Sequence, residues 1–262
     1  MKKIFLTLAM VSFLISCSDN KKETEIAKNN DWTNRHLKGE VKSLEETSYT
    51  PDSTGKTGAM DSCCIEIQQF NEKGYSNASQ TKDSKGTVKN ESSMTFYEGG
   101  QVKEFVTMSN GKKINTTSID IDKDGKYVGA RNMDSSGKVT SFYTDLKEDA
   151  YGAITSGIEK NPDSSVKSIF SAAYDKGLQI SATLKDSSGK TTYTFKAELN
   201  DKSDIAKTTT TNISKDTTTT TVITYTYETY DDQGNWLQRT TYDEKGKATK
   251  VVKRAYAYYK KD

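Results

Sequence analysis

The sequence predicts an all-β fold, an antiparallel β-meander of repeated hairpins. Turn clusters recur about every 12–14 residues, and apolar and polar residues alternate along the segments between them. Only 32% of the residues are hydrophobic, too few for a thick core, so we expect each strand to bury one face. About 14–16 strands fit between Val41 and Tyr259, as an open twisted sheet or a partially curled barrel.

The N-terminal segment, residues 1–17, precedes this fold. A short basic head, Lys2-Lys3, is followed by an apolar stretch that suits the core of a signal peptide. The segment ends in Leu14-Ile15-Ser16-Cys17, which resembles the cleavage motif of bacterial lipoproteins. That resemblance implies cleavage before Cys17 and lipidation of its thiol by palmitate-like chains. The alternative is an ordinary secretory signal with a chance cysteine.

The rest of the chain divides into a polar tether over residues 18–31 and one β-repeat domain over residues 32–262. Ser18 resembles the residue that permits sorting to the outer membrane, where the protein would face the periplasm or the exterior. The membrane is therefore an expected partner, bound through the N-terminal lipid anchor. Buried acyl methylenes contribute about 0.8 kcal/mol each to such an anchor.

The predicted turns combine Asp or Asn with Gly, as in Asp186-Ser187-Ser188-Gly189. Asp or Asn binds its own backbone two residues on, and Gly supplies the positive φ. The next segment places Tyr193, Phe195, Ala197 and Leu199 on one face. Threonine runs at 208–211 and 217–221 are predicted as solvent-facing strands around a turn near residues 212–216, with a disordered insertion as the alternative.

A membrane-spanning barrel is disfavoured by the polarity of the strands. Lipid-facing positions would have to be apolar on every strand, and residues 87–93 are polar on both faces.

Several turns also resemble the YD repeats of Rhs-type and teneurin-like β shells and of small Bacteroidetes-like lipoproteins. In these repeats an aromatic residue ends a strand, Asp or Asn opens the turn and Gly closes it. The matching segments are Phe70-Asn71-Glu72-Lys73-Gly74, Tyr174-Asp175-Lys176-Gly177, Tyr230-Asp231-Asp232-Gln233-Gly234 and Tyr242-Asp243-Glu244-Lys245-Gly246. The turns at 161–163 and 200–203 lack the glycine. The resemblance implies β architecture and an extracytoplasmic place, but no chemistry.

No motif for catalysis or cofactor binding stands out, so we expect a non-enzymatic protein without a cofactor. The single histidine, His36, is interpreted as a surface residue, and no phosphate loop, HExxH motif or nucleophile elbow occurs. With 38 basic and 36 acidic residues the chain lacks the positive surplus of a nucleic-acid binder.

Two groups of residues offer weak ligand sites. Asp120, Asp122 and Asp124 match the first half of a calcium loop, but Arg131 stands where a bidentate Glu is needed, which favours a simple turn. Cys63 and Cys64 lack the spacing of a zinc site. We interpret one or both as small buried residues with free thiols, with an intermolecular disulfide as the alternative.

Aromatic residues gather near the C-terminus and give two interpretations. They form either the packed face of a thin sheet or a binding platform. The candidate surface comprises Tyr225, Tyr227, Trp236, Tyr242, Tyr256 and Tyr258. The leading hypothesis is a lipid-anchored envelope scaffold that binds a protein partner, in part through its sheet edges. The alternative is a glycan-binding accessory lipoprotein, which requires these rings to be exposed and coplanar.

Overall fold

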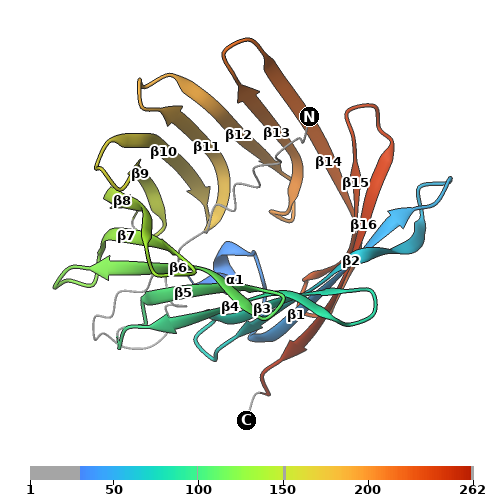
Figure 1. The fold of residues 1–262 in the computed structure, drawn as a ribbon. Coiled ribbons are helices and arrows are strands. Elements are labelled where there is room, and N and C mark those ends of the chain that lie inside the picture. The colour runs from blue at the N-terminus through green and yellow to red at the C-terminus, as the bar shows by residue number, and fades with distance from the viewer. Residues whose placement is uncertain (1–29, 99, 150–151, 261–262) are drawn as a thin grey trace.

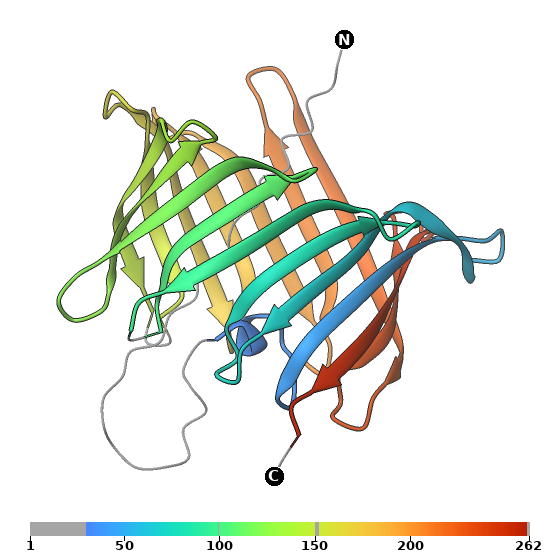
Figure 2. The same ribbon diagram turned by 60° about the horizontal axis from the view of Figure 1, so that its bottom comes forward.

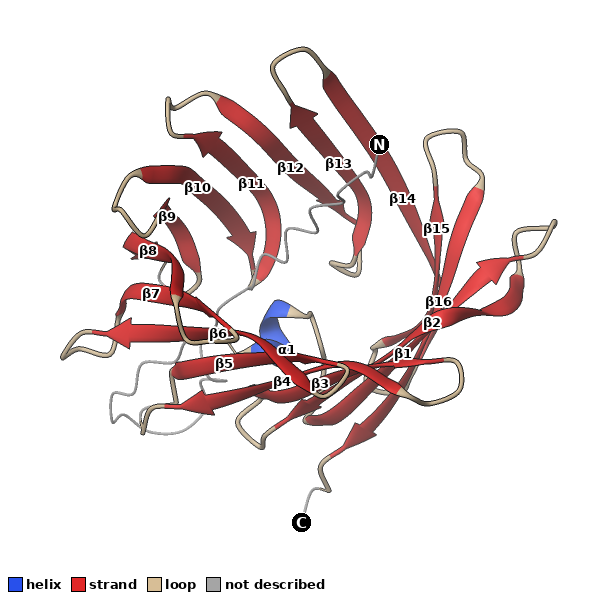
Figure 3. Ribbon diagram, in the orientation of Figure 1, coloured by secondary structure: helices blue, strands red, loops and turns tan. Residues whose placement is uncertain are grey.

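The computed structural model describes residues 30–98, 100–149 and 152–260. Sixteen strands form a single closed antiparallel barrel in which each strand pairs with its sequence neighbours and β1 pairs with β16. Figure 1 shows the strands arranged as a ring, and Figure 3 shows that one short helix, α1 (Asp31–Asn34), interrupts this all-β architecture. No helix of the described residues is long and apolar enough to cross a membrane.

The strands follow one another with short turns. They are β1 (Val41–Pro51), β2 (Thr57–Phe70), β3 (Ser76–Asp83), β4 (Val88–Phe96), β5 (Val102–Ser109), β6 (Lys112–Ile121), β7 (Tyr127–Asp134), β8 (Val139–Glu148), β9 (Ile154–Lys160), β10 (Val166–Asp175), β11 (Leu178–Asp186), β12 (Thr191–Leu199), β13 (Ile205–Ile213), β14 (Thr218–Tyr230), β15 (Trp236–Tyr242) and β16 (Ala248–Tyr258). The threonine runs lie in β13 and β14, so their prediction as strands is confirmed.

The expectation of an open or partially curled sheet is wrong. Leu44 of β1 stands opposite Tyr256 of β16, and Ser48 stands opposite Val252. This pairing satisfies the backbone groups that the first and last strands of an open sheet would expose. It also removes the two sheet edges that were expected to recruit a partner strand.

The turn between β11 and β12 shows why these loops are so regular. The Asp186 carboxylate accepts hydrogen bonds from the backbone amides of Ser188 at 2.9 Å and Lys190 at 3.0 Å. Gly189 adopts a φ of 84°, a left-handed conformation that disfavours a side chain. The Ser188 hydroxyl, together with the two amides, lowers the pKa of Asp186. Each such turn therefore forms from its own five residues.

Residues 30–40, which we call the strap, cross one end of the barrel. Trp32 donates its backbone N–H to the Gly74 carbonyl in the β2–β3 turn, and Thr33 packs beside Gly177 in the β10–β11 turn. These two turns belong to opposite walls of a sixteen-strand barrel. We call this end the strap end, and Figure 2 shows α1 lying within it. The other end, the far end, carries the turns that follow the odd-numbered strands.

The strap continues across further turns before it enters β1. His36 contacts Asp204 of the β12–β13 turn at 3.4 Å. The backbone N–H and carbonyl of Lys38 both bind the Asn235 side chain in the β14–β15 turn, at 2.8 and 2.7 Å. His36 is therefore half-buried at a packed contact, not the surface residue that the sequence suggested.

Candidate functional site: the barrel lumen

One face of every strand points into the barrel. Directly opposed residues of an antiparallel pair share a face, so the register can be followed around the ring. On one wall Phe170 stands opposite Leu184, Leu184 opposite Tyr193 and Ala182 opposite Phe195. From Ala197 the inward face continues through the opposed residues Thr208, Ile223 and, two residues on, Tyr225. The inward face then passes through Arg239 of β15, Val252 of β16, and Ser48 and Glu46 of β1. It continues through Glu66 of β2 and Thr81 of β3, back toward the wall that contains Phe170.

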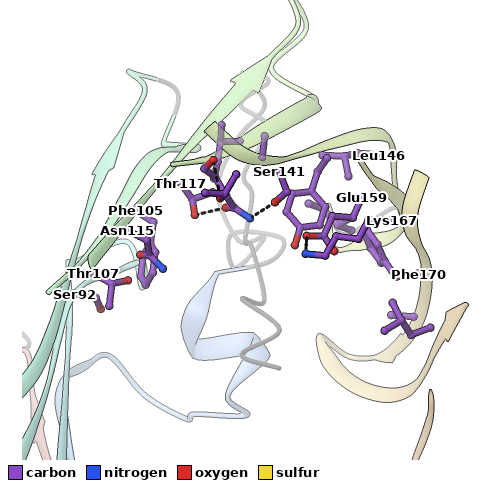
Figure 4. A pocket seen from close by; sticks show the side chains of 18 of the residues that line it. Ser92, Phe105, Thr107, Asn115, Thr117, Ser141, Leu146, Glu159, Lys167 and Phe170 are labelled. Carbon is purple, nitrogen blue, oxygen red and sulfur yellow. Dashed lines mark hydrogen bonds and ion pairs between the residues drawn. The ribbon is translucent and has the colours of Figure 1, made fainter. Parts of the chain in front are cut away.

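The inward face encloses a cavity of about 620 Å³ between the walls of β3–β11. That volume is in the range of small-molecule sites. Figure 4 shows its side chains, which include Ser92, Phe105, Thr107, Asn115, Thr117, Ser141, Leu146, Glu159, Lys167 and Phe170.

Apolar side chains line the cavity nearest the strap end. The Tyr143 and Phe170 rings meet edge to face, with centroids 6.2 Å apart. Gly157 lies beside them, and a Cβ there would come within 2.6 Å of Leu146 Cδ2 and 2.7 Å of Phe170 Cε1. Below this level a buried cluster that includes Ile119 and Ala130 forms the floor. The cavity therefore rests on a close-packed apolar base.

Polar side chains line the cavity nearer the far end. Thr117 donates to the Asn132 carboxamide oxygen at 2.7 Å, and the Asn132 amide donates to Ser141 at 3.0 Å, forming a ladder across three strands (Figure 4). Glu159 accepts from Lys167 at 2.8 Å and from Ser168 at 3.1 Å. The site is thus amphipathic along the barrel axis.

Charge and burial act together on the phenol of Tyr143. Burial raises its pKa to about 12, and the negative charge of Glu159 contributes to the same shift. Tyr143 therefore stays neutral at physiological pH, when its hydroxyl can donate a hydrogen bond.

The outward face of the described strands mixes polar and apolar side chains, with Phe142, Ile158 and Ile169 among the apolar ones. On β12, Lys196 and Glu198 point outward and are exposed, whereas Phe195 and Ala197 point inward. Arg131 of β7 pairs with Asp120 of β6 at 2.9 Å across the outer surface. A barrel in contact with lipid shows an apolar band outside and a polar lumen. Both faces of this barrel carry polar and apolar side chains, with Glu159 and Lys167 inside and Lys196 and Glu198 outside.

The predicted aromatic surface is divided between faces. Tyr225, Tyr227 and Tyr256 point inward, whereas Tyr242 points outward opposite Thr224. Trp236 is only 6% exposed. Tyr258 stacks on Tyr256 with centroids 6.0 Å apart and donates to Asp231. These rings do not make the single exposed, coplanar platform that the glycan hypothesis requires.

The candidate cation residues occupy a turn and the strand before it. Asp122 accepts from the amides of Asp124 and Lys126, both at 2.9 Å, and Asp120 pairs with Arg131. The turn interpretation is therefore confirmed. Across the described ranges, no group of three or more His, Cys, Asp or Glu side chains is arranged to hold a metal.

The cysteines differ from expectation or lie outside the described residues. Cys63 is exposed and disulfide-bonded, which corrects its interpretation as a buried residue with a free thiol. Cys17 and its lipidation fall outside the described residues, as does the signal segment 1–17.

No protein-family profile matches the sequence, and no curated protein does. Among solved structures the fold is similar to a porin-like protein from Bacteroides uniformis, with a TM-score of 0.54 at 12% identity over 83% of this chain and 96% of the other. A porin-like protein from Bacteroides vulgatus covers 84% of this chain and 100% of its own, with 10% identity and a TM-score of 0.29. A Tc holotoxin pore from Photorhabdus luminescens reaches a TM-score of 0.32 at 11% identity, over 88% of this chain and 13% of its own.

At 12% identity the first similarity shows a shared fold and no more, and the two lower TM-scores support no argument. The YD and Rhs resemblance stays a prediction.

Proposed function

We propose that this chain is a non-enzymatic binding protein of the outer membrane that holds an amphipathic, largely apolar ligand inside its barrel. The observation that carries the proposal is the cavity of about 620 Å³ inside the barrel, into which the side chains of Phe170, Tyr143 and Leu184 face. Apolar surface inside a closed sheet contributes to binding only if a ligand covers it. The apolar side chains nearest the strap end can pack against the apolar end of such a ligand. The polar side chains nearer the far end can form hydrogen bonds with its polar end.

The outer-membrane location rests on the lipid anchor predicted at Cys17 and is supported by the porin-like fold. Charged outward residues such as Lys196 and Glu198 favour a barrel that stands beside the bilayer. The chain between Cys17 and the strap can reach at most about 45 Å. The strap end therefore lies within this distance of the membrane surface.

Solubility without detergent tests this arrangement. A Cys17→Ser variant, exported by a cleavable signal, should partition into the aqueous phase and remain monodisperse without detergent. The unmodified, lipidated protein is the control and should partition with membranes. A Cys17→Ser protein that still requires detergent would place the barrel within the bilayer and contradict the proposal.

Neighbouring alanines of β10 allow a sharp test of lumen binding. Ala172 lines the cavity and Ala173 points outward. We expect Ala172→Trp to fill the cavity and abolish binding of an apolar fluorescent probe such as N-phenyl-1-naphthylamine. Ala173→Trp adds the same side chain one residue away and should leave probe affinity unchanged. Equal probe affinity in both variants would refute a lumen site.

A glycan is the second candidate occupant. Asn132 and Glu159 supply hydrogen-bonding groups beside the Phe170 ring, a combination that also suits a sugar. Displacement of the probe by soluble oligosaccharides, with no displacement by fatty acids or alcohols, would favour this reading. The reverse result is the one that the predominantly apolar lining leads us to expect.

A further inference from the structure

Arg239 is an inward-facing cation on the wall opposite the cavity floor residues. It lies on β15 directly opposite Tyr227 of β14 and Val252 of β16, both of which face the lumen. Its guanidinium carbon is 4.9 Å from the ring centroid of Tyr225 and 4.9 Å from that of Trp236. Cation–π contacts of this kind hold a guanidinium in place without neutralising its charge.

The hydrogen bonds of Arg239 are incomplete in the described structure. Its Nε is buried and has no acceptor among the described residues. The Tyr227 hydroxyl, which interacts with the Arg239 side chain, donates its own proton to the Ile205 carbonyl at 2.8 Å. A guanidinium has five N–H donors, and buried donors without acceptors are rare. Arg239 therefore retains donors for a further acceptor.

Charges of both signs surround Arg239 on this wall. Arg254 Nε donates to Glu46 at 2.6 Å, and its guanidinium carbon lies 3.5 Å from the Trp236 ring centroid. Burial would raise the pKa of Glu46, but Arg254, Arg239 and the strap residue Arg35 together lower it. Glu66 stands opposite Glu46, and the charges of Asp204 and Asp231 act on Tyr227 and Tyr256 of the same wall. The capacity of this wall to bind an anion therefore depends on the unfilled donors of Arg239.

We propose that Arg239, assisted by Arg254, forms an anion subsite in the lumen that binds the carboxylate or phosphate end of an amphipathic ligand. This inference rests on the proposed lumen binding and adds the charge of the ligand to it. The planar guanidinium matches the geometry of a carboxylate or phosphate and can bind either in a bidentate manner. The half-buried Tyr225 and Arg239 keep the subsite accessible from the lumen.

Ligands that share a chain and differ only in their end group test the subsite. Decanoate and decanol would be titrated into the full mature protein by calorimetry. We expect the wild type to bind decanoate at least about tenfold more tightly, the size of effect that a charge-assisted hydrogen bond gives. Arg239→Gln should lose this preference and keep its affinity for decanol. Arg131→Gln, on the outer face, should leave both affinities unchanged.

The conservative variant Arg239→Lys keeps the charge and should retain part of the preference. An Arg239→Gln protein that still prefers decanoate would overturn the subsite. Equal binding of the two ligands by the wild type would overturn it as well, even if Arg239→Gln failed to fold. Failure of the wild type to bind either ligand would instead refute the lumen site itself, so the two failures are distinguishable.

Discussion

The two ends of the barrel use the same turn chemistry but differ in packing. At the strap end the turn glycines lie against other side chains. A Cβ at Gly74 would come within 2.6 Å of Trp32, and one at Gly177 within 2.7 Å of Thr33. At the far end Gly86, Gly111, Gly137, Gly189 and Gly246 have nothing within 4 Å. Tight local turns are therefore common to the whole molecule, whereas tertiary contacts between turns belong to one end.

The two buried hydrophobic clusters lie toward the strap end, although Val251 and Val252, nearer the far end of β16, are buried as well. One buried cluster joins Leu37 of the strap to Val41, Leu44 and Phe70, and the other contains Val102, Ile119, Tyr127 and Ala130, at or just above the strap end. A single sheet closed into a wide ring cannot fill its own lumen. Side chains of the strap fill the lumen at the strap end, and the cavity remains open above them. Stability and binding capacity are thus located at different heights in one barrel.

Truncating an apolar side chain at each end should give the largest contrast. Phe70, 2% exposed, packs beneath the strap, whereas Val139 is half-buried at the far-end start of β8. We expect Phe70→Ala to lower the free energy of unfolding by about 3–5 kcal/mol and Val139→Ala by about 1 kcal/mol or less. Urea denaturation followed by circular dichroism measures both. Similar losses would show that the core is not confined to the strap end.

Turn glycines offer a closer match because their backbones are alike. Gly74 has a φ of 82° and Gly189 a φ of 84°, so either alanine variant incurs about 1–2 kcal/mol of left-handed strain. Gly74→Ala also forces a clash with Trp32 and Asn30, and should cost about 2 kcal/mol more than Gly189→Ala. The difference between their denaturation midpoints isolates the strap contact. Equal denaturation midpoints would mean that the strap moves away from residue 74 with no loss in the free energy of unfolding.

The parts of this structure that the sequence could predict are local. Asp186 and Gly189 form their turn with residues no more than four positions away, so the turn period and strand alternation were readable. Closure depends on Leu44 meeting Tyr256 from opposite ends of the chain, which no local pattern encodes. The same strands could equally form an open sheet, because the pattern within each strand does not specify that β1 pairs with β16.

The lumen site was missed because its residues become neighbours only on closure. Tyr143, Glu159 and Phe170 come from three strands, and none belongs to a motif. One signal could have distinguished the ends. Strap-end turns are often flanked by aromatic residues, as in Phe70 to Tyr75 and Tyr230 to Trp236, whereas far-end turns are polar, as in residues 134–138 and 186–190. Buried turns are those with apolar flanks.

Asp31 makes the strap contact sensitive to pH. Burial raises the pKa of its carboxyl to about 6, against the opposing effects of the Ser76 amide and Arg35. Because the folded pKa exceeds the unfolded value, the folded state binds the extra proton, and stability falls as pH rises from about 4 to 6. Over this pH range we expect the free energy of unfolding of Asp31→Asn to fall by about 2 kcal/mol less than that of the wild type. Denaturation at pH 4 and pH 7 of both proteins measures the difference, and parallel profiles would exclude Asp31 as its source.

Replacing the far-end carboxylate Asp186 should have the smallest effect and the opposite pH dependence. Asp186→Ala loses two bonds to exposed backbone amides that water can replace, so its midpoint should shift less than that of Gly189→Ala. Since hydrogen bonds lower the folded pKa of Asp186, its contribution is present at neutral pH and is lost as pH falls through that value. The variant and the wild type should therefore converge in acid, where the Asp31 comparison also narrows. If Asp186→Ala instead reduced probe binding in the lumen, the far end would contribute to the site, and the separation of stability from binding would fail.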